Sequence, residues 1–280
     1  MNTNRPAATD DAPKVIEVER LVTHYGSRRI LSDITIDVHA GEIMVIMGGS
    51  GSGKSTLLRH LMALATPTSG RVRILGKDIS RLSMRETFAL RKKMGVSFQG
   101  GALFSSMTVG ENIMLPLVER TDLDPKTMEI MVRMKLEVVS LAGFADLMPA
   151  ELSGGMIKRA AVARAIIMDP QILFMDEPSA GLDPVVSSAL DELILRLREA
   201  MGMAIVVVTH ELDSAFAIAD RITVLDRGEI LCTGTVGEVR NHPSERVQNL
   251  LNRKLEDEPV DPDEYLRRLL GEQAAEEKRP

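Results

Sequence analysis

A single glycine-rich stretch limits what this chain can fold into more than any other feature. Residues 48–56 read Gly-Gly-Ser-Gly-Ser-Gly-Lys-Ser-Thr and fit the pattern G-x-x-x-x-G-K-[ST] of a phosphate-binding loop. A continuous apolar run at 43–47, typical of a buried parallel strand, precedes it, and residues 56–62 begin a helix. This strand–loop–helix order predicts a site for a nucleoside triphosphate.

The residue types in the loop suit a triphosphate. Glycines let the backbone wrap closely around an anion, and the helix N-terminus adds partial positive charge. Lys54 should reach the β- and γ-phosphates, and the Ser55 hydroxyl should ligate Mg²⁺. The loop residues expected to hold the nucleotide are Gly48, Gly49, Ser50, Gly51, Ser52, Gly53, Lys54, Ser55 and Thr56.

Composition narrows the class of protein. The 280 residues are 44% hydrophobic, enough for one large domain with subdomains or for two small domains. The net charge of −6, without a long basic tract, argues against a nucleic-acid partner. The lone Cys232 excludes an internal disulfide and fits a reducing compartment. The N-terminus lacks a secretory signal and no apolar run approaches the roughly 20 residues that cross a bilayer, so we expect a cytoplasmic protein, with attachment to a membrane partner left open.

Two kinds of strand alternate with helices along the chain. The segments 15–22 and 31–38 read as antiparallel strands and 71–79 as an antiparallel strand and turn, whereas 94–98, 171–178 and 204–209 read as short or buried strands like the one before the loop. Tyr25 sits between the first two strands, where it could stack on a nucleotide base or be a solvated turn residue.

The region from about 108 to 165 reads as mostly helical. Its spacing suggests a core-facing stripe of apolar residues, namely Met128, Met131, Met134, Val138 and Leu141. Just before it lie Ala102, Leu103, Phe104 and Met107. These four either line a groove for a membrane partner or pack inside the helical region.

Polar residues follow several strands, where open α/β sheets bind ligands. Asp176 and Glu177 end one buried strand, and two adjacent carboxylates indicate Mg²⁺ chemistry, with Asp176 holding the ion and Glu177 polarising the attacking water. Gln99 could ligate Mg²⁺ and orient that water, or be a loop residue; His210 could contact the γ-phosphate, or be a capping residue. Ser153, Gly154 and Gly155 open a helix, as a second anion site or an ordinary cap.

Taken together, the ordered set resembles an ABC-type ATPase from about residue 15 to 240. The resemblance implies base stacking by Tyr25, a Walker A loop at Gly48–Thr56, a Q-loop at Gln99 and a signature motif at Ser153–Gly155. It further implies that Asp176 is the Walker B residue, Glu177 the catalytic base, Ser179–Asp183 the D-loop and His210 the switch histidine.

The same resemblance implies a fold, cofactors and an assembly. The fold is an α/β P-loop NTPase with a RecA-like parallel core sheet, an antiparallel β subdomain and an inserted α-helical subdomain at about 100–165, all within an ATPase domain at 14–240. ATP and Mg²⁺ are the implied cofactors. A head-to-tail homodimer is also implied, in which Ser153 of one copy meets the γ-phosphate held by the other.

Finer features are similar to the ATPases of Mla-type, MCE-associated lipid transporters. They are residues 98–104, residues 108–113 and Met156, which replaces the usual signature glutamine. The similarity implies phospholipid transport, an integral-membrane permease, a partner carrying an MCE domain, and a peripheral place on the cytoplasmic face of the inner membrane. Importers of amino acids or other small solutes share most of these residues and remain the alternative.

Two further interpretations concern rival functions and the chain ends. A non-transport ABC ATPase acting on DNA is disfavoured because no sustained heptad repeats lie between Lys54 and Ser153. A non-transport ABC ATPase acting on ribosomes is disfavoured because such relatives carry two ATPase domains in one chain, whereas this chain has one.

Residues 1–13 are expected to be disordered, and 241–280 to form a helical, acidic tail that begins with an amphipathic helix at 245–251. This tail could dock on a sister subunit.

Overall fold

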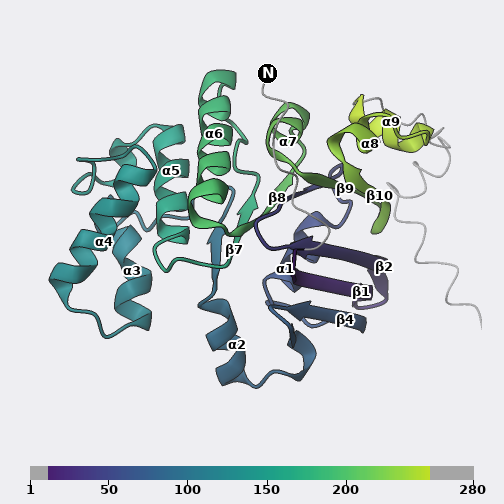
Figure 1. Ribbon diagram of the computed structural model, residues 1–280, viewed down its shortest axis with the longest axis horizontal. Coiled ribbons are helices and arrows are strands. Elements are labelled where there is room, and N and C mark those ends of the chain that lie inside the picture. The colour runs from purple at the N-terminus through teal and green to yellow at the C-terminus, as the bar shows by residue number, and fades with distance from the viewer. Residues whose placement is uncertain (1–11, 253–280) are drawn as a thin grey trace, which may run out of the picture.

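The computed structural model describes residues 12–252 of the chain. Residues 1–11 of the predicted disordered N-terminus and residues 253–280 of the predicted acidic tail therefore lie outside the described residues. Within them, two sheets and a set of helices form one layered arrangement (Figure 1).

The first sheet is the parallel core that the loop motif predicted. It has six strands in the order β10-β9-β3-β8-β7-β6, and only β10 runs antiparallel to its neighbour. Its strands are β3 (Ile43–Met47), β6 (Met94–Ser97), β7 (Ile172–Asp176), β8 (Ala204–Thr209), β9 (Arg221–Asp226) and β10 (Glu229–Thr235). Because β3, β7 and β8 are neighbours, the segments that come after them meet at one edge of the sheet.

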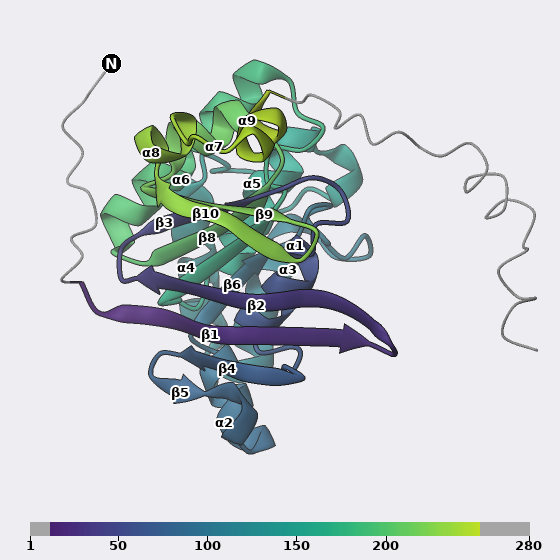
Figure 2. The same ribbon diagram turned by 90° about the vertical axis from the view of Figure 1, so that its right-hand side faces the viewer.

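The second sheet is antiparallel, also as predicted. Its strand order is β2-β1-β4-β5, and Figure 2 shows these strands side by side. The strands are β1 (Lys14–Tyr25), β2 (Arg28–His39), β4 (Ser69–Ile74) and the two-residue β5 (Lys77–Asp78). Their alternating burial leaves one face toward the core and the other toward solvent, which explains the alternating sequence pattern.

The parallel sheet is buried on both faces, which is why its strands read as continuous apolar runs. Along β3, Ile43, Val45 and Met47 pack into the core cluster that also holds residues of the helices. Met44 and Ile46 point the other way, into the cluster shared with the antiparallel sheet. Strand alternation thus sends neighbouring residues into two different cores.

Helices α3 (Val109–Arg120), α4 (Pro125–Val138) and α5 (Gly154–Ala165) lie on the far side of the parallel sheet from β1 and β2 (Figure 1). Thr108 caps α3 with a capping box, Asp124 caps α4 ahead of a proline, and Ser153 caps α5. The prediction that 108–165 is mostly helical is confirmed, apart from the turns and the short 3₁₀ helix η2 (Pro149–Glu151) between α4 and α5.

The predicted core stripe on α4 is partly wrong. The helix buries Met128, Val132 and Leu136, whereas Met134 is 59% and Val138 44% exposed. With 3.6 residues per turn, each step of three residues falls about 60° short of a full turn, so Met134 lies far from the face of Met128. Steps of four residues keep the buried residues on one face.

The remaining helices complete the layers. They are α1 (Lys54–Leu61), α2 (Met84–Arg91), α6 (Pro184–Met201), α7 (Leu212–Ile218), α8 (Val236–Arg240), α9 (Glu245–Leu251) and the 3₁₀ helix η1 (Ile79–Arg81). The amphipathic helix predicted at 245–251 is confirmed, with Val247 fully buried. Arg246 also forms an ion pair with Asp226, so α9 is fixed to the end of β9.

A buried histidine predicts how stability depends on pH. His60 on α1 is fully buried, with Nε2 2.7 Å from the Thr23 hydroxyl and Nδ1 3.1 Å from the Ala65 carbonyl, so Nδ1 carries the proton. Burial lowers the pKa of His60 below 6.5. The unfolded chain therefore takes up this proton at a higher pH than the folded chain, and the free energy of unfolding should fall as pH drops below about 6.5, by up to about 1.4 kcal/mol per pH unit.

The measurement is urea unfolding at pH 5.5, 6.5 and 7.5 for the wild type and His60→Gln. We expect a smaller pH dependence in His60→Gln, because the amide can donate and accept but does not titrate. The exposed His24 supplies the matched control, His24→Gln, which should keep the wild-type dependence. Equal slopes in all three chains would contradict the assignment.

Candidate functional site

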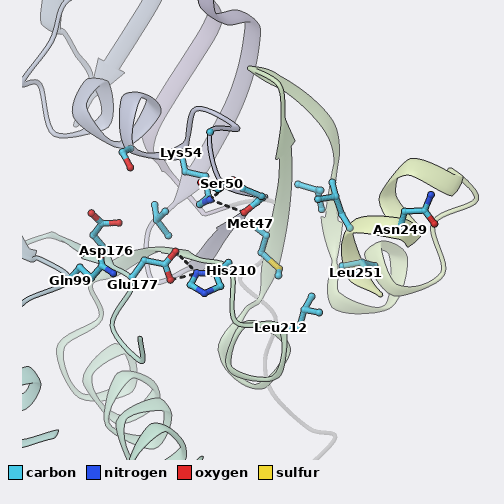
Figure 3. A pocket seen from close by; sticks show the side chains of 17 residues that line it. Met47, Ser50, Lys54, Gln99, Asp176, Glu177, His210, Leu212, Asn249 and Leu251 are labelled. Carbon is cyan, nitrogen blue, oxygen red and sulfur yellow. Dashed lines mark hydrogen bonds and ion pairs between the residues drawn. The ribbon is translucent and has the colours of Figure 1, made fainter. Parts of the chain in front are cut away.

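The candidate site is a cavity of about 640 Å³ at the carboxyl ends of β3, β7 and β8. Figure 3 shows side chains from three directions facing it: the phosphate-binding loop, the end of β7, and the segment after β8. Its predicted residues are Gly48, Gly49, Ser50, Gly51, Lys54, Ser55, Gln99, Asp176, Glu177 and His210. Residues far apart in sequence thus meet where the loop motif predicted a nucleotide.

The loop at 48–53 wraps around the Lys54 ammonium. Its Nζ donates to the carbonyls of Gly48 at 2.7 Å and Gly49 at 2.8 Å. An ammonium has three N–H donors, so a third can reach an anion in the cavity. A glycine is required at 48, since a Cβ there would lie 2.1 Å from the Leu225 carbonyl oxygen.

The start of α1 favours an anion. Gly53, with φ +104°, precedes the helix in the left-handed region, which favours glycine, and no side chain caps its first N–H groups. The first turn of the helix holds no acidic residue. The helix therefore presents uncompensated N–H groups and the positive end of its dipole to the cavity.

Glu177 is held tightly at the end of β7. Its φ of +46° is unusual for a residue with a side chain, and its N–H donates to the Val208 carbonyl at 2.8 Å. Thr209 Oγ1 donates to Oε2 at 3.0 Å, and His210 Nδ1 lies 2.8 Å from Oε1 (Figure 3). Because a carboxylate only accepts, the His210 Nδ1 carries the proton of this bond.

Electrostatics at the site favour a bound cation. Burial raises the pKa of Asp176, and the neighbouring Glu177 raises it further, while Lys54 and Lys158 oppose both effects. Burial lowers the pKa of Lys54, whereas the nearby carboxylates of Glu177 and Asp176 raise it. Two crowded, partly desolvated carboxylates are costly unless a cation joins them.

The donor atoms fit Mg²⁺. Ser55, Gln99 and Asp176 all line the cavity and offer a hydroxyl, an amide and a carboxylate oxygen, the ligand type that Mg²⁺ prefers. Within 12–252 no group of three or more His, Cys, Asp or Glu side chains is arranged to hold a metal by itself. Mg²⁺ usually binds through one or two protein groups plus phosphate oxygens and water.

Several predicted residues do not line this cavity. Tyr25 lies half-exposed at the end of β1, and Ser52, Gly53 and Thr56 lie within or behind the loop. The stretch Ser153–Gly155 starts α5 elsewhere, where the Ser153 hydroxyl accepts from the Met156 N–H at 3.3 Å. Their roles in nucleotide binding stay predictions.

Sequence reasoning missed part of the lining. Asn249, Leu250 and Leu251 of α9 reach the cavity together with Leu212 of α7, and Leu250 lies near Gly49 of the loop, where an added Cβ would be 3.9 Å from its Cδ2. No local signal reveals this contact, since it depends on the distant Arg246–Asp226 pair that fixes α9. Lys158, a buried cation on α5 beside the site, was also missed.

Comparison with known proteins gives consistent matches. The profile of the ABC transporter family matches residues 31–180. The intermembrane phospholipid transport system ATP-binding protein MlaF of Haemophilus influenzae is 40% identical over 237 residues, covering 85% of this chain and 90% of that protein. The probable ribonucleotide transport ATP-binding protein mkl of Mycobacterium leprae is 41% identical over 219 residues, covering 78% of this chain and 63% of that protein.

Solved structures agree with the fold. A dimeric ATP-binding cassette solved in a post-hydrolysis state with ADP and phosphate has a TM-score of 0.71 at 30% identity, covering 79% of this chain and 98% of that one. CbiO1 from Clostridium perfringens, part of an ABC transporter complex, has a TM-score of 0.77 at 30% identity, covering 86% and 96%. These likenesses confirm the predicted arrangement of a parallel core sheet, an antiparallel sheet and helices.

Proposed function

The chain belongs to the ABC transporter family of ATP-binding proteins, and from this premise we propose that it binds and hydrolyses ATP to drive phospholipid transport by a membrane complex of the Mla type. The observation that carries the hydrolytic part is the Glu177 carboxylate, held by His210 and Thr209 at the edge of the cavity that Lys54 enters. The phospholipid cargo rests on the 40% identity to MlaF.

The described residues divide the work of hydrolysis among them. The loop N–H groups and Lys54 bind the phosphates, and Glu177 accepts a proton from the attacking water while His210 orients its carboxylate. Ser55, Gln99 and Asp176 would hold Mg²⁺. When bound, Mg²⁺ supplies neutralisation of charge on the phosphate oxygens.

The proposed assembly is a head-to-tail homodimer of an ATPase domain at 14–240, with its helical subdomain at about 100–165. In such a dimer Ser153, Gly154 and Gly155 of one copy would complete the nucleotide site of the other. Two facts support this. The signature stretch opens a helix and does not line the cavity of its own chain, and a related cassette was solved as a dimer with ADP and phosphate.

A membrane partner is also proposed, because the relative MlaF is an ATP-binding protein of an intermembrane phospholipid transport system. No helix in the described part of the chain is long and apolar enough to cross a bilayer. Two cavities beside α2 and α3 adjoin, since they share Leu64, Arg91, Pro116 and Arg120, and together, here called the groove, they suit a helix of the permease. Their apolar lining includes Leu64, Phe88, Phe98, Ala102, Phe104 and Pro116, and charged side chains such as Arg91 and Arg120 lie at their walls. Of the four residues whose role was left open, Ala102 and Phe104 face this groove, while Leu103 packs against the core.

Phe88→Asp should abolish co-purification of the permease while basal ATPase activity and melting temperature stay near wild type. Phe88 is 59% exposed and lines the groove. A carboxylate at this position should therefore weaken the binding of an apolar helix in the groove, because the charge would be buried there, without lowering the stability of the fold. Met84 on the same helix is 78% exposed and does not line the groove, so Met84→Asp is the matched control. Equal recovery of the permease with both variants would contradict this docking site.

The proposed function is tested by purifying the tagged chain from native membranes in mild detergent and identifying what accompanies it. A permease together with a protein carrying an MCE domain is the expected result. Recovery of a permease together with a solute-binding protein would indicate that the cargo is a small solute and not a phospholipid. Recovery without a membrane protein would contradict a transport function.

A further inference from the structure

Lys158 on α5 is a buried cation that no part of the proposed reaction uses. Only 8% of the residue is exposed, and its ammonium donates to the carbonyl oxygens of Gln99 and, at 3.2 Å, of Glu177. Burial lowers the pKa of Lys158, while Glu177 and Asp176 oppose this effect. A buried charge that donates to backbone carbonyls is costly, which calls for a reason why it is there.

The two carbonyls belong to residues that matter at the site. Gln99 comes after β6 and Glu177 after β7, and both side chains line the nucleotide cavity. Lys158 contacts neither side chain in these bonds, only the backbone from which each side chain projects. Lys158 therefore fixes the backbone positions of Gln99 and Glu177, and these hydrogen bonds do not involve the groups that their side chains bind.

The Glu177 backbone needs such support. Its φ of +46° is strained for a residue with a Cβ, and it is held by the N–H bond to the Val208 carbonyl. On the other side, its carbonyl accepts from Lys158 and, at 3.3 Å, from the Ala180 N–H. The lysine bond comes from α5, so this helix is coupled directly to the strained peptide.

The segment after Gln99 is held to the same helix. Arg164 of α5 donates to the carbonyls of Gly101 at 2.8 Å and Ala102 at 2.7 Å. Gly101 packs so closely that a Cβ would lie 2.8 Å from Cγ2 of Ile157. Lys158 and Arg164 therefore hold residues 99–102 on α5, and Lys158 alone extends this contact to Glu177.

We propose that Lys158 is a positioning residue for ATP hydrolysis, which joins α5, Gln99 and Glu177 into one unit through backbone carbonyls. The inference rests on the proposed hydrolytic function. Because Ser153 caps α5, the signature stretch is linked to Glu177 through residues 154–157 of the helix and the Lys158 side chain. A displacement of the base by about 1 Å is enough to cost on the order of 10²-fold in rate.

The test compares Lys158→Met, Lys158→Gln and Lys158→Arg in the full chain. Met keeps the length but removes the donors, Gln keeps donors without charge, and Arg keeps both. We expect Lys158→Met to lower kcat roughly 10- to 100-fold, with the dissociation constant for ATP changed less than about threefold. Lys158→Gln and Lys158→Arg should recover most of kcat, because donation to the carbonyls is what matters.

The neighbouring Arg159 supplies the matched control. It lies on the same helix but donates to the Val139 and Ser140 carbonyls, away from the cavity, so Arg159→Met should keep kcat. If Lys158→Met matched Arg159→Met, the proposal would be overturned. Recovery by Arg but not by Gln would overturn it too, since charge and not positioning would then be the cause.

A double variant separates positioning from general structural damage. If Lys158 acts through Glu177, then Lys158→Met should lower kcat less than about twofold when Glu177→Gln is already present, since linked effects do not add. A full multiplicative loss would overturn the proposal. A wild-type chain without ATPase activity would overturn the proposed function and this inference together, whereas an active wild type beside an unaffected Lys158→Met would overturn this inference alone.

Discussion

Glu177→Gln is expected to lower ATP turnover by roughly 10² to 10⁴ while ATP binding is preserved, the usual contribution of a general base. Glutamine has nearly the shape of glutamate, so its carbonyl can accept from His210 Nδ1–H and its amide can face the Thr209 hydroxyl. What it loses is the ability to take a proton. The measurement is steady-state phosphate release together with the dissociation constant for ATP.

The control for this prediction is an exposed acid away from the site. Glu192 on α6 meets that requirement, and Glu192→Gln should hydrolyse ATP at the wild-type rate. A Glu177→Gln chain with unchanged phosphate release would mean that Glu177 is not the base. Loss of ATP binding in the same variant would instead assign the carboxylate a part in shaping the site.

Much of this fold could be predicted because its signals are local. The run 43–47 is apolar throughout because β3 is buried on both faces, whereas 15–22 alternates because β1 has one solvated face. The loop motif placed Lys54 and Ser55, and strand ends placed Asp176 and Glu177, because parallel strands deliver their carboxyl ends to one edge. Periodicity and strand direction suffice for these inferences.

Other features depend on contacts between distant segments, which local patterns do not encode. The exposure of Met134 depends on which face of α4 meets α3 and α5. The approach of Leu250 to the loop depends on the Arg246–Asp226 ion pair. Lys158 looked like an ordinary helix cation, and only the packing of α5 against β6 buries it beside two carbonyls.

Lys54→Ala should act on a different step, by weakening ATP binding itself. A hydrogen bond to a charged group contributes about 1.5–3 kcal/mol, so losing the ammonium should raise the dissociation constant roughly 10- to 100-fold. The binding titration should use ADP as well as ATP. If Lys54 reaches the γ-phosphate, its removal should lower the affinity for ATP more than the affinity for ADP. Arg59, an exposed cation on the same helix α1, supplies the control Arg59→Ala, which should bind both nucleotides normally.

Two effects of the removed ammonium can be told apart. Lys54 also donates to the Gly48 and Gly49 carbonyls, so its loss relaxes the loop as well as removing charge. It further opposes the rise in the pKa of Asp176, so that carboxyl should become easier to protonate in Lys54→Ala. If weaker binding came from the loop alone, ADP and ATP would lose affinity equally; if it came from charge at the γ-phosphate, the loss for ATP would be larger. Unchanged affinity for both would contradict the assignment of this loop as the phosphate site.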